Sequence, residues 1–177
     1  MINLPNLFTL VRLFLTPFIA RAILSGSYGQ AIILFFIAGV SDAIDGFLAR
    51  RLDESTSLGA YFDPLADKIL LSVIYLSLGA AGAIPWWMVA VVLGRDILIL
   101  AMACYGLLFT SVRKFPPSVW GKISTFLQIL AALVVMGARY GVPAPVEFAL
   151  WFMVTGTLVS GFHYAWRAVM LLRANMN

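Results

Sequence analysis

Four aspartates lie within a short segment of otherwise strongly apolar sequence. Asp42 and Asp45 are three positions apart, and Asp63 and Asp67 are four positions apart. Residues at these spacings share one face of an α-helix, so each pair is expected to project from one side of its own helix. A charged residue at mid-membrane costs about 2.5–3.5 kcal/mol on insertion scales, and packing alone does not justify that cost. The segment is therefore predicted to be a functional site that binds metal.

The short link between the two pairs makes their helices antiparallel neighbours, so the pairs are expected to face each other at similar depth. Four converging carboxylates need a countercharge. Oxygen-only ligands select hard cations, with Mg²⁺ as the first choice and Mn²⁺ or Ca²⁺ as alternatives. Four acids can hold two ions, and two ions can clamp a phosphoryl group that undergoes in-line attack.

Small and basic residues accompany the acids. Gly46 and Ala49 lie on or beside the acidic face of the first helix, and Gly59 precedes Asp63 by four positions. Without bulk at these positions a ligand can lie close to the backbone, although close helix packing through small residues is the alternative explanation. Arg50 either neutralises a diphosphate or extends to the membrane interface, as long basic side chains do.

The composition belongs to a membrane protein. Of the 177 residues, 62% are hydrophobic and 11% are charged, and the mean hydropathy is +0.97. Soluble domains carry about 25% charged residues. The net charge of +4 comes from scattered basic residues, which suits lipid headgroups and phosphate ligands and argues against nucleic acid as a partner. The single Cys104 excludes an internal disulfide and a cysteine-based zinc site.

Six apolar windows are long enough to span a membrane, since a hydrocarbon core of roughly 30 Å needs about 20 helical residues. The windows are 5–25, 29–50, 57–80, 85–109, 117–138 and 146–170. Short links with turn signals separate them. The sequence therefore predicts an all-α integral membrane protein, a six-transmembrane-helix bundle that forms a single domain over residues 1–177.

The distribution of basic residues predicts the orientation. Positive charges gather in the second and fourth links and at the C-terminal end, whereas the opposite side offers only Arg21 and Arg139. The residues on the richer side are Arg50, Arg51, Arg113, Lys114, Arg167 and Arg173. The positive-inside rule then places both termini and the acidic ends of the helices in the cytoplasm. We expect a bacterial cytoplasmic (inner) membrane protein whose site faces the cytoplasm.

The acids, the small residues and Arg50 together form a pattern with fixed spacing. The pattern is Asp42-x2-Asp45-Gly46-x2-Ala49-Arg50-x8-Gly59-x3-Asp63-x3-Asp67. It resembles, at every position, the signature of the CDP-alcohol phosphatidyltransferase family. The similarity extends to LPNLFTLVR at the start of the chain and to GKISTFLQ at 121–128.

The resemblance implies a six-helix membrane enzyme, usually a homodimer, in which an acceptor hydroxyl displaces CMP from a CDP-linked lipid. It implies that Asp67 takes the hydroxyl proton as well as binding metal. The implied metal ligands are Asp42, Asp45, Asp63 and Asp67, which would hold Mg²⁺ or Mn²⁺, with two ions per site. The implied CDP-binding residues are Asp42, Gly46, Ala49, Arg50 and Gly59.

Three basic residues, Arg12, Arg95 and Lys122, lie inside apolar windows, where each is expensive and needs a partner. Each is a candidate for binding the phosphate of the acceptor, and structural pairing with the motif acids or a helix end is the alternative. Asp96 adjoins Arg95, but consecutive helical residues diverge, so a direct pair between them is not expected. His163 is expected to be a hydrogen-bonded packing residue.

Within the family, the segments FDPLADKILLSVIYLSL, IP and GRDILIL resemble most the eukaryotic-type cardiolipin synthases, which join CDP-diacylglycerol to phosphatidylglycerol. The related phosphatidylglycerophosphate synthases use glycerol 3-phosphate and share nearly all these landmarks. The expected partners are CDP-diacylglycerol, a phosphate-bearing glycerol acceptor and the lipid bilayer, and phosphatidylglycerol is slightly favoured as the acceptor. A cation-binding transporter also places acids in a helical bundle, but it does not need the small and basic positions, and no inverted repeat is visible.

Overall fold

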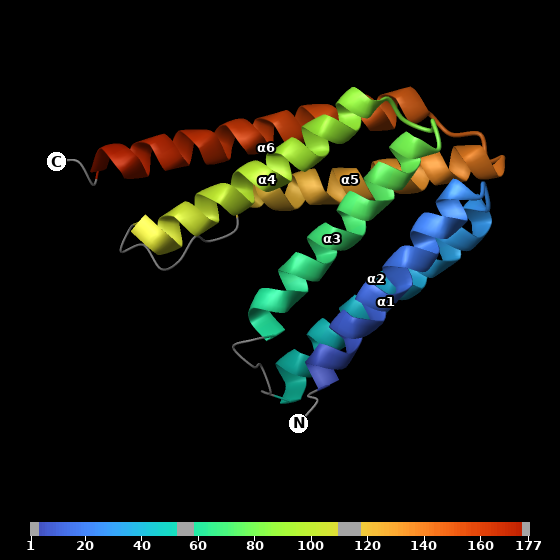
Figure 1. Ribbon diagram of the computed structural model, residues 1–177, viewed down its shortest axis with the longest axis horizontal. Coiled ribbons are helices and arrows are strands. Elements are labelled where there is room, and N and C mark those ends of the chain that lie inside the picture. Colours follow the sequence, from blue (N-terminus) through green and yellow to red (C-terminus); the bar gives the residue numbers. More distant parts are fainter. Residues whose placement is uncertain (1–3, 53–58, 110–117, 175–177) are drawn as a thin grey trace. The chain divides into compact units, whose positions relative to one another are not determined.

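In the part of the chain that the structure describes, six α-helices follow one another (Figure 1). They are α1 (Leu4–Leu24), α2 (Tyr28–Leu52), α3 (Gly59–Ala80), α4 (Trp86–Phe109), α5 (Val119–Tyr140) and α6 (Val146–Ala174). The computed structural model describes residues 4–52, 59–109 and 118–174, without the side chains of 4–9, 42–52, 59–65, 103–109, 168–169 and 171–174. No strand occurs in the described ranges, so the predicted all-α class is confirmed.

Glycines in a left-handed conformation end three of the helices. After α1, Gly26 has a φ of 74°, and the Ser27 N–H donates to the Ala22 carbonyl at 2.8 Å. This bond satisfies a carbonyl that the last helical turn leaves open, and the missing Cβ permits the positive φ. The same arrangement ends α3 at Gly82 and α5 at Gly141. These turns explain why the helices end near the predicted window ends.

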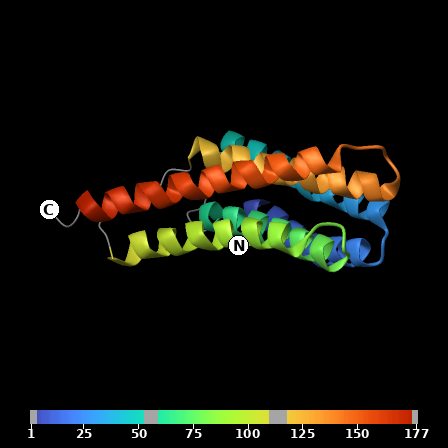
Figure 2. The same cartoon turned by 90° about the horizontal axis from the view of Figure 1, so that it is seen from above.

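The helices group into two compact units, and the first comprises Met1–Ile84 and Ala132–Ala144. In this unit α1 packs along both α2 and α3, and α1 and α2 lie side by side in Figure 1 and Figure 2. Branched aliphatic side chains such as Ile19 and Ile74 are fully buried there. The Arg139 guanidinium donates to the Gly82 carbonyl at 2.7 Å, which ties the end of α5 to the turn after α3.

The second unit comprises Pro85–Ala131 and Pro145–Asn177. Here α4 packs against α6. Thr157 of α6 forms buried hydrogen bonds with Ser124 at 3.4 Å and with Gln128 at 3.2 Å, both from α5. Hydrogen bonds between helices suit an apolar surrounding, where polar side chains need partners within the protein.

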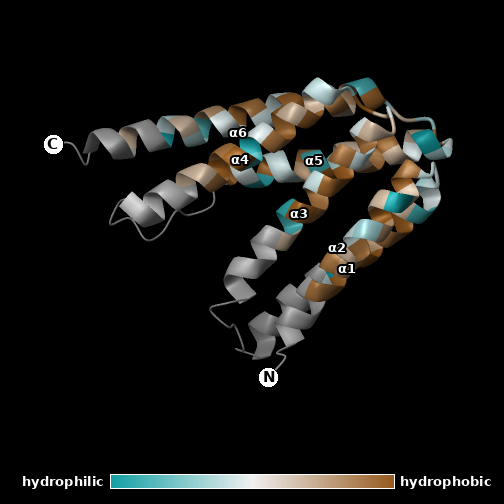
Figure 3. Ribbon diagram, viewed as in Figure 1, coloured by the Kyte–Doolittle hydropathy of each residue, from teal (hydrophilic) through white to brown (hydrophobic). Residues whose placement is uncertain are grey.

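Large apolar side chains point outward as well as inward. Phe14, Phe148 and Phe162 are 66%, 70% and 74% exposed, and Figure 3 shows hydrophobic residues along much of the described helices. Exposed apolar surface of this kind suits hydrocarbon better than water. Among the described residues, two helical segments are long and apolar enough to cross a membrane, Val119–Tyr140 and Val146–Arg167. The six-span bundle, its orientation and its single-domain organisation stay predictions.

Close contact between α5 and α6 generates a stability prediction. A Cβ at Gly156 would come within 2.6 Å of Leu127 Cδ1, whereas a Cβ at Gly137 would meet nothing within 4 Å. The Leu127 side chain must move to admit the larger Val side chain, and because Cδ1 is the end of a flexible side chain the cost is about 1 kcal/mol, the lower end of the usual range for overpacking. We therefore expect Gly156→Val to lower the thermal unfolding midpoint in detergent, with Gly137→Val as the matched control. Equal midpoints for the two variants would contradict close packing at Gly156.

Candidate functional site

The motif aspartates lie at the linked ends of two helices. Asp42 and Asp45 are near the end of α2, and Asp63 and Asp67 are near the start of α3. The expectation that both pairs are helical is therefore confirmed. The side chains of Asp42, Asp45 and Asp63 lie outside the described residues, as do those of the predicted CDP-binding residues Gly46, Ala49, Arg50 and Gly59. The facing of the two pairs and the residue roles stay predictions.

The fourth aspartate, Asp67, pairs with a residue far away in the sequence. The Arg12 guanidinium of α1 donates from Nη1 to Oδ1 of Asp67 in α3. The Arg12 side chain is 2% exposed, whereas the Asp67 side chain is 49% exposed. Structural pairing with a motif acid, which was the alternative for the basic residues in the apolar windows, is thus what the structure shows for Arg12.

Asp67 is the motif acid whose side chain allows a test of the metal hypothesis. Its half-exposed carboxylate is a hard oxygen donor of the kind that Mg²⁺ and Mn²⁺ prefer. Among the side chains that the structure describes, no three His, Cys, Asp or Glu residues gather. Asp67 therefore fits an oxygen-ligated cation, and the complete ligand set stays a prediction.

Arg95 is the centre of a buried polar network in the second unit. Its Nε and Nη2 donate to Ser160 Oγ of α6 at 3.3 and 2.9 Å. Nη2 also donates to the Gly121 carbonyl of α5 at 3.3 Å. One guanidinium from α4 thus joins three helices, and the planar fork of an arginine suits such multiple bonding.

The expectation that Arg95 and Asp96 do not pair is wrong. Nη1 of Arg95 donates to Oδ1 of Asp96 at 2.6 Å, and the two side chains are 6% and 11% exposed. The diverging Cβ directions of consecutive helical residues set where the side chains begin, but the long arginine chain can fold back. Because an unpaired buried charge is costly, the conformation in which the Arg95 side chain folds back to Asp96 is favoured.

Lys122 lies in the first turn of α5, immediately after the Gly121 carbonyl that Arg95 contacts. Its side chain is exposed. Ser118 caps this helix, because its Oγ accepts the Gly121 N–H at 3.0 Å. The structure thus places Lys122 at the edge of the Arg95 network, and it places Arg12 in the other unit with Asp67.

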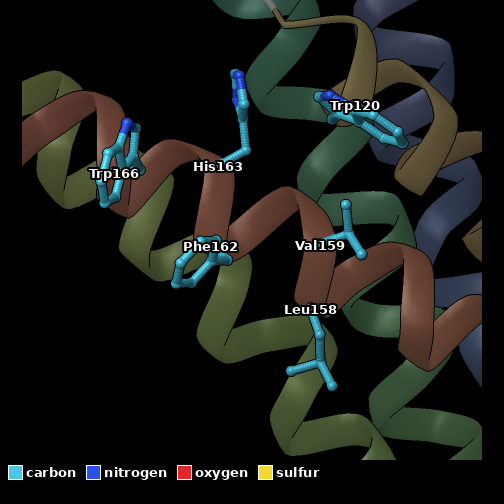
Figure 4. Close-up of a pocket in the computed structure, with 6 residues that line it drawn as sticks. All are labelled: Trp120, Leu158, Val159, Phe162, His163 and Trp166. Carbon is cyan, nitrogen blue, oxygen red and sulfur yellow. The ribbon is translucent and has the colours of Figure 1, made fainter.

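An open hollow of about 660 Å³ lies on the surface of the second unit. Figure 4 shows the side chains that line it. They are Trp120 of α5 and Leu158, Val159, Phe162, His163 and Trp166 of α6. Such a lining suits hydrocarbon and offers little to a nucleotide or phosphate. His163 was expected to be hydrogen-bonded, but within the described residues its buried Nδ1 has no partner.

The sequence did not identify the partners that hold the basic residues in place. It flagged Arg12 and Arg95 because buried charges are expensive, but it did not connect Arg12 with Asp67 or Arg95 with Ser160. Those residues are 55 and 65 positions apart. The cost of the charge was the signal that a partner existed, and helix packing chose the partner.

Comparison with known proteins adds to this geometry. A family model described as CDP-alcohol phosphatidyltransferase matches residues 2–172, which confirms the resemblance indicated by the motif. The cardiolipin synthase (CMP-forming) of Rattus norvegicus is 27% identical over 97% of this chain. The match spans 64% of the rat protein, which is less than two thirds of its length.

Two bacterial proteins named CDP-diacylglycerol–glycerol-3-phosphate 3-phosphatidyltransferase are also similar. The one from Aquifex aeolicus is 36% identical over 75% of this chain and 75% of its own length. The one from Bacillus subtilis is 31% identical over 93% of this chain and 94% of its own length. The names of these relatives thus divide between cardiolipin synthase and glycerol-3-phosphate 3-phosphatidyltransferase.

The Arg95 network generates a second stability prediction. Arg95→Met removes the buried partner of the Asp96 carboxylate, and breaking a buried ion pair costs about 3–5 kcal/mol. We expect a lower thermal unfolding midpoint in detergent. Arg95→Met combined with Asp96→Asn should recover part of the loss because the carboxylate charge that Arg95 balanced is gone, with Asp96→Asn alone as the control. A double variant no more stable than Arg95→Met would contradict the coupling.

Proposed function

This chain belongs to the CDP-alcohol phosphatidyltransferase family, and we propose that it transfers a phosphatidyl group from CDP-diacylglycerol to a glycerol hydroxyl with release of CMP. The family match over residues 2–172 carries the proposal. The helical positions of the motif aspartates and the half-exposed Asp67 carboxylate support it. A cation transporter, the alternative class, has no support from the relatives, whose names describe synthases and transferases.

In the proposed reaction Asp67 accepts the proton of the acceptor hydroxyl. The hydroxyl oxygen then forms a bond to the phosphorus that carries diacylglycerol. The bond between that phosphorus and the bridging oxygen of the diphosphate breaks, and CMP leaves with the electron pair. A carboxylate suits this role because it is ionised at neutral pH and can hold one proton during the transfer.

The residues proposed to hold the donor lie at the linked ends of α2 and α3. Asp42, Asp45, Asp63 and Asp67 would hold two Mg²⁺ or Mn²⁺ ions, which would supply positive charge to the diphosphate when bound. The donor would lie against Asp42, Gly46, Ala49, Arg50 and Gly59. Small residues at three of these positions let the backbone approach the ligand, and Arg50 adds a positive charge.

The proposed acceptor carries a phosphate as well as a hydroxyl, and Lys122 and Arg95 are the residues proposed to serve the binding of that phosphate. The exposed side chain of Lys122 is accessible to a ligand. Every nitrogen of the Arg95 guanidinium already has a partner within the protein. We therefore assign Lys122 the direct contact and Arg95 the support of the helix turn that carries Lys122.

Phosphatidylglycerol is the first proposed acceptor, because the landmarks after Asp63 resemble the cardiolipin synthases and the rat relative carries that name. Glycerol 3-phosphate is the second. It is favoured by the relative from Bacillus subtilis, which aligns with nearly the full length of both chains. Both acceptors offer a glycerol hydroxyl and a phosphate, so the proposed chemistry is the same.

We further propose that six helices cross a bacterial cytoplasmic membrane, with both termini and the active site on the cytoplasmic side, and that the protein is a homodimer. The asymmetry of basic residues supports the orientation. The exposed apolar side chains of the described helices support contact with lipid.

An acceptor panel tests the proposed function. Purified protein with CDP-diacylglycerol and Mn²⁺ is given phosphatidylglycerol, glycerol 3-phosphate, inositol phosphate or serine, and the lipid product is identified by mass. We expect CMP release with one of the first two acceptors and its loss on chelation of the metal. Protein that binds the metal ion yet releases no CMP with any acceptor would end the transferase proposal.

Replacement of the proposed base gives a second test. Asp67→Asn should lower CMP release by about 100-fold or more, because general-base catalysis contributes roughly 10²–10⁴-fold. Binding of CDP-diacylglycerol should be largely retained. Glu147→Gln, which neutralises an exposed acid at the start of α6, is the matched control and should remain fully active. Unchanged turnover in Asp67→Asn would remove Asp67 as the base.

A further inference from the structure

Arg12 is a buried cation whose partner is the proposed catalytic acid. It is among the largest fully buried side chains in the described residues. Removing a charged group from water costs several kcal/mol even after relaxation, so a buried guanidinium needs acceptors within the protein. One of them is Oδ1 of Asp67, which receives the Arg12 Nη1–H across the contact between α1 and α3.

The Arg12–Asp67 and Arg95–Asp96 ion pairs differ in one respect. In the Arg95–Asp96 pair both side chains are buried, at 6% and 11% exposure, so both charges are enclosed by the protein. In the Arg12–Asp67 pair the arginine is 2% exposed but the acid is 49% exposed. The cation is enclosed, whereas the carboxylate remains accessible from outside. An accessible carboxylate that is hydrogen-bonded to a buried cation is suited to contact a ligand in a defined orientation.

We propose that Arg12 is a positioning residue for the transfer reaction, holding Oδ1 of Asp67 so that the carboxylate faces the acceptor hydroxyl in one orientation. This inference rests on the proposed function, in which Asp67 takes the hydroxyl proton. A carboxylate has two oxygens and about four lone-pair sites, so the N–H···O bond from Arg12 can orient it without exhausting its capacity to accept. Orientation matters because misplacement of a reacting group by about 1 Å can cost roughly 100-fold in rate.

The backbone around Arg12 fixes the base of the side chain. Thr16, one turn further along α1, donates from its hydroxyl to the Arg12 carbonyl at 2.8 Å. Both residues are buried. The role inferred here differs from the phosphate-binding role that the sequence predicted for Arg12, because a guanidinium that is 2% exposed presents almost no surface to a soluble or lipid phosphate.

Kinetics of Arg12 variants test the inference in the full-length protein in detergent. Arg12→Met should lower kcat for CMP release by about 10- to 100-fold, with the KM for the acceptor changed less than about twofold because substrate binding does not involve Arg12. Arg12→Lys, which keeps the charge on a shorter fork-free side chain, should recover part of kcat. Ser77→Ala, which removes a buried hydroxyl of α3 in the same unit, is the control and should behave as the wild type.

A thermal double-mutant cycle supplies a readout without turnover. Asp67→Asn leaves the buried guanidinium without its carboxylate, whereas Arg12→Met leaves a half-exposed acid that water can solvate. We therefore expect Asp67→Asn to lower the unfolding midpoint more than Arg12→Met does, and the double variant to recover part of the loss. Additive effects of the two single variants would show that the side chains are not coupled and would overturn the inference.

Other outcomes also decide whether Arg12 is a positioning residue. A raised acceptor KM at unchanged kcat would make Arg12 an acceptor ligand instead, and a wild-type kcat in Arg12→Met would remove any role in the reaction. If Arg12→Met does not fold, Arg12→Gln, which removes the charge but keeps a polar side chain, carries the test, and wild-type kcat in that variant overturns the inference. If the wild-type protein releases no CMP with either proposed acceptor, the proposed function is wrong. If the wild type is active and Arg12→Met has the same kcat, only the positioning role is wrong.

Discussion

A guanidinium group inside an apolar helical unit must find acceptors within the protein, and this requirement organises both units of the chain. Arg12 and Arg95 are 2% and 7% exposed, and the penalty for enclosing such a charge is several kcal/mol. Arg12 meets Asp67 between α1 and α3. Arg95 meets Asp96, Ser160 and the Gly121 carbonyl, and so joins α4, α5 and α6. In each unit the arginine restricts which helix faces can pack together.

The same requirement links stability with the proposed chemistry. Asp67 satisfies a buried cation on one side and remains accessible on the other, so one carboxylate contributes to helix packing and is available for proton transfer. In the second unit the buried Arg95 network supports the start of α5, and Lys122 follows there with an exposed side chain. In each unit an enclosed arginine thus joins helices, and a more exposed charged side chain lies beside it.

The choice of acceptor depends on features finer than this arrangement. The two proposed acceptors, phosphatidylglycerol and glycerol 3-phosphate, share a glycerol hydroxyl and a phosphate, so the proposed base and the proposed basic side chain suit either. Relatives with both kinds of name, cardiolipin synthase and glycerol-3-phosphate 3-phosphatidyltransferase, resemble this chain at 27–36% identity. Phosphatidylglycerol differs from glycerol 3-phosphate in its acyl chains, so the acceptor panel asks whether those chains are accommodated.

The sequence by itself determined the helices, the family and the helical positions of the acids. Apolar windows and glycines such as Gly26 act through local backbone preferences, and the Asp42–Asp67 motif is a matter of spacing along the chain. Only the tertiary structure decided the partners of the buried cations. Arg12 and Asp67, which pair between α1 and α3, are 55 positions apart in the sequence. Arg95 and Asp96 form a contact although the Cβ atoms of consecutive helical residues point in different directions. Both contacts depend on which polar side chains are buried next to each other, and the packing of the helices decides this.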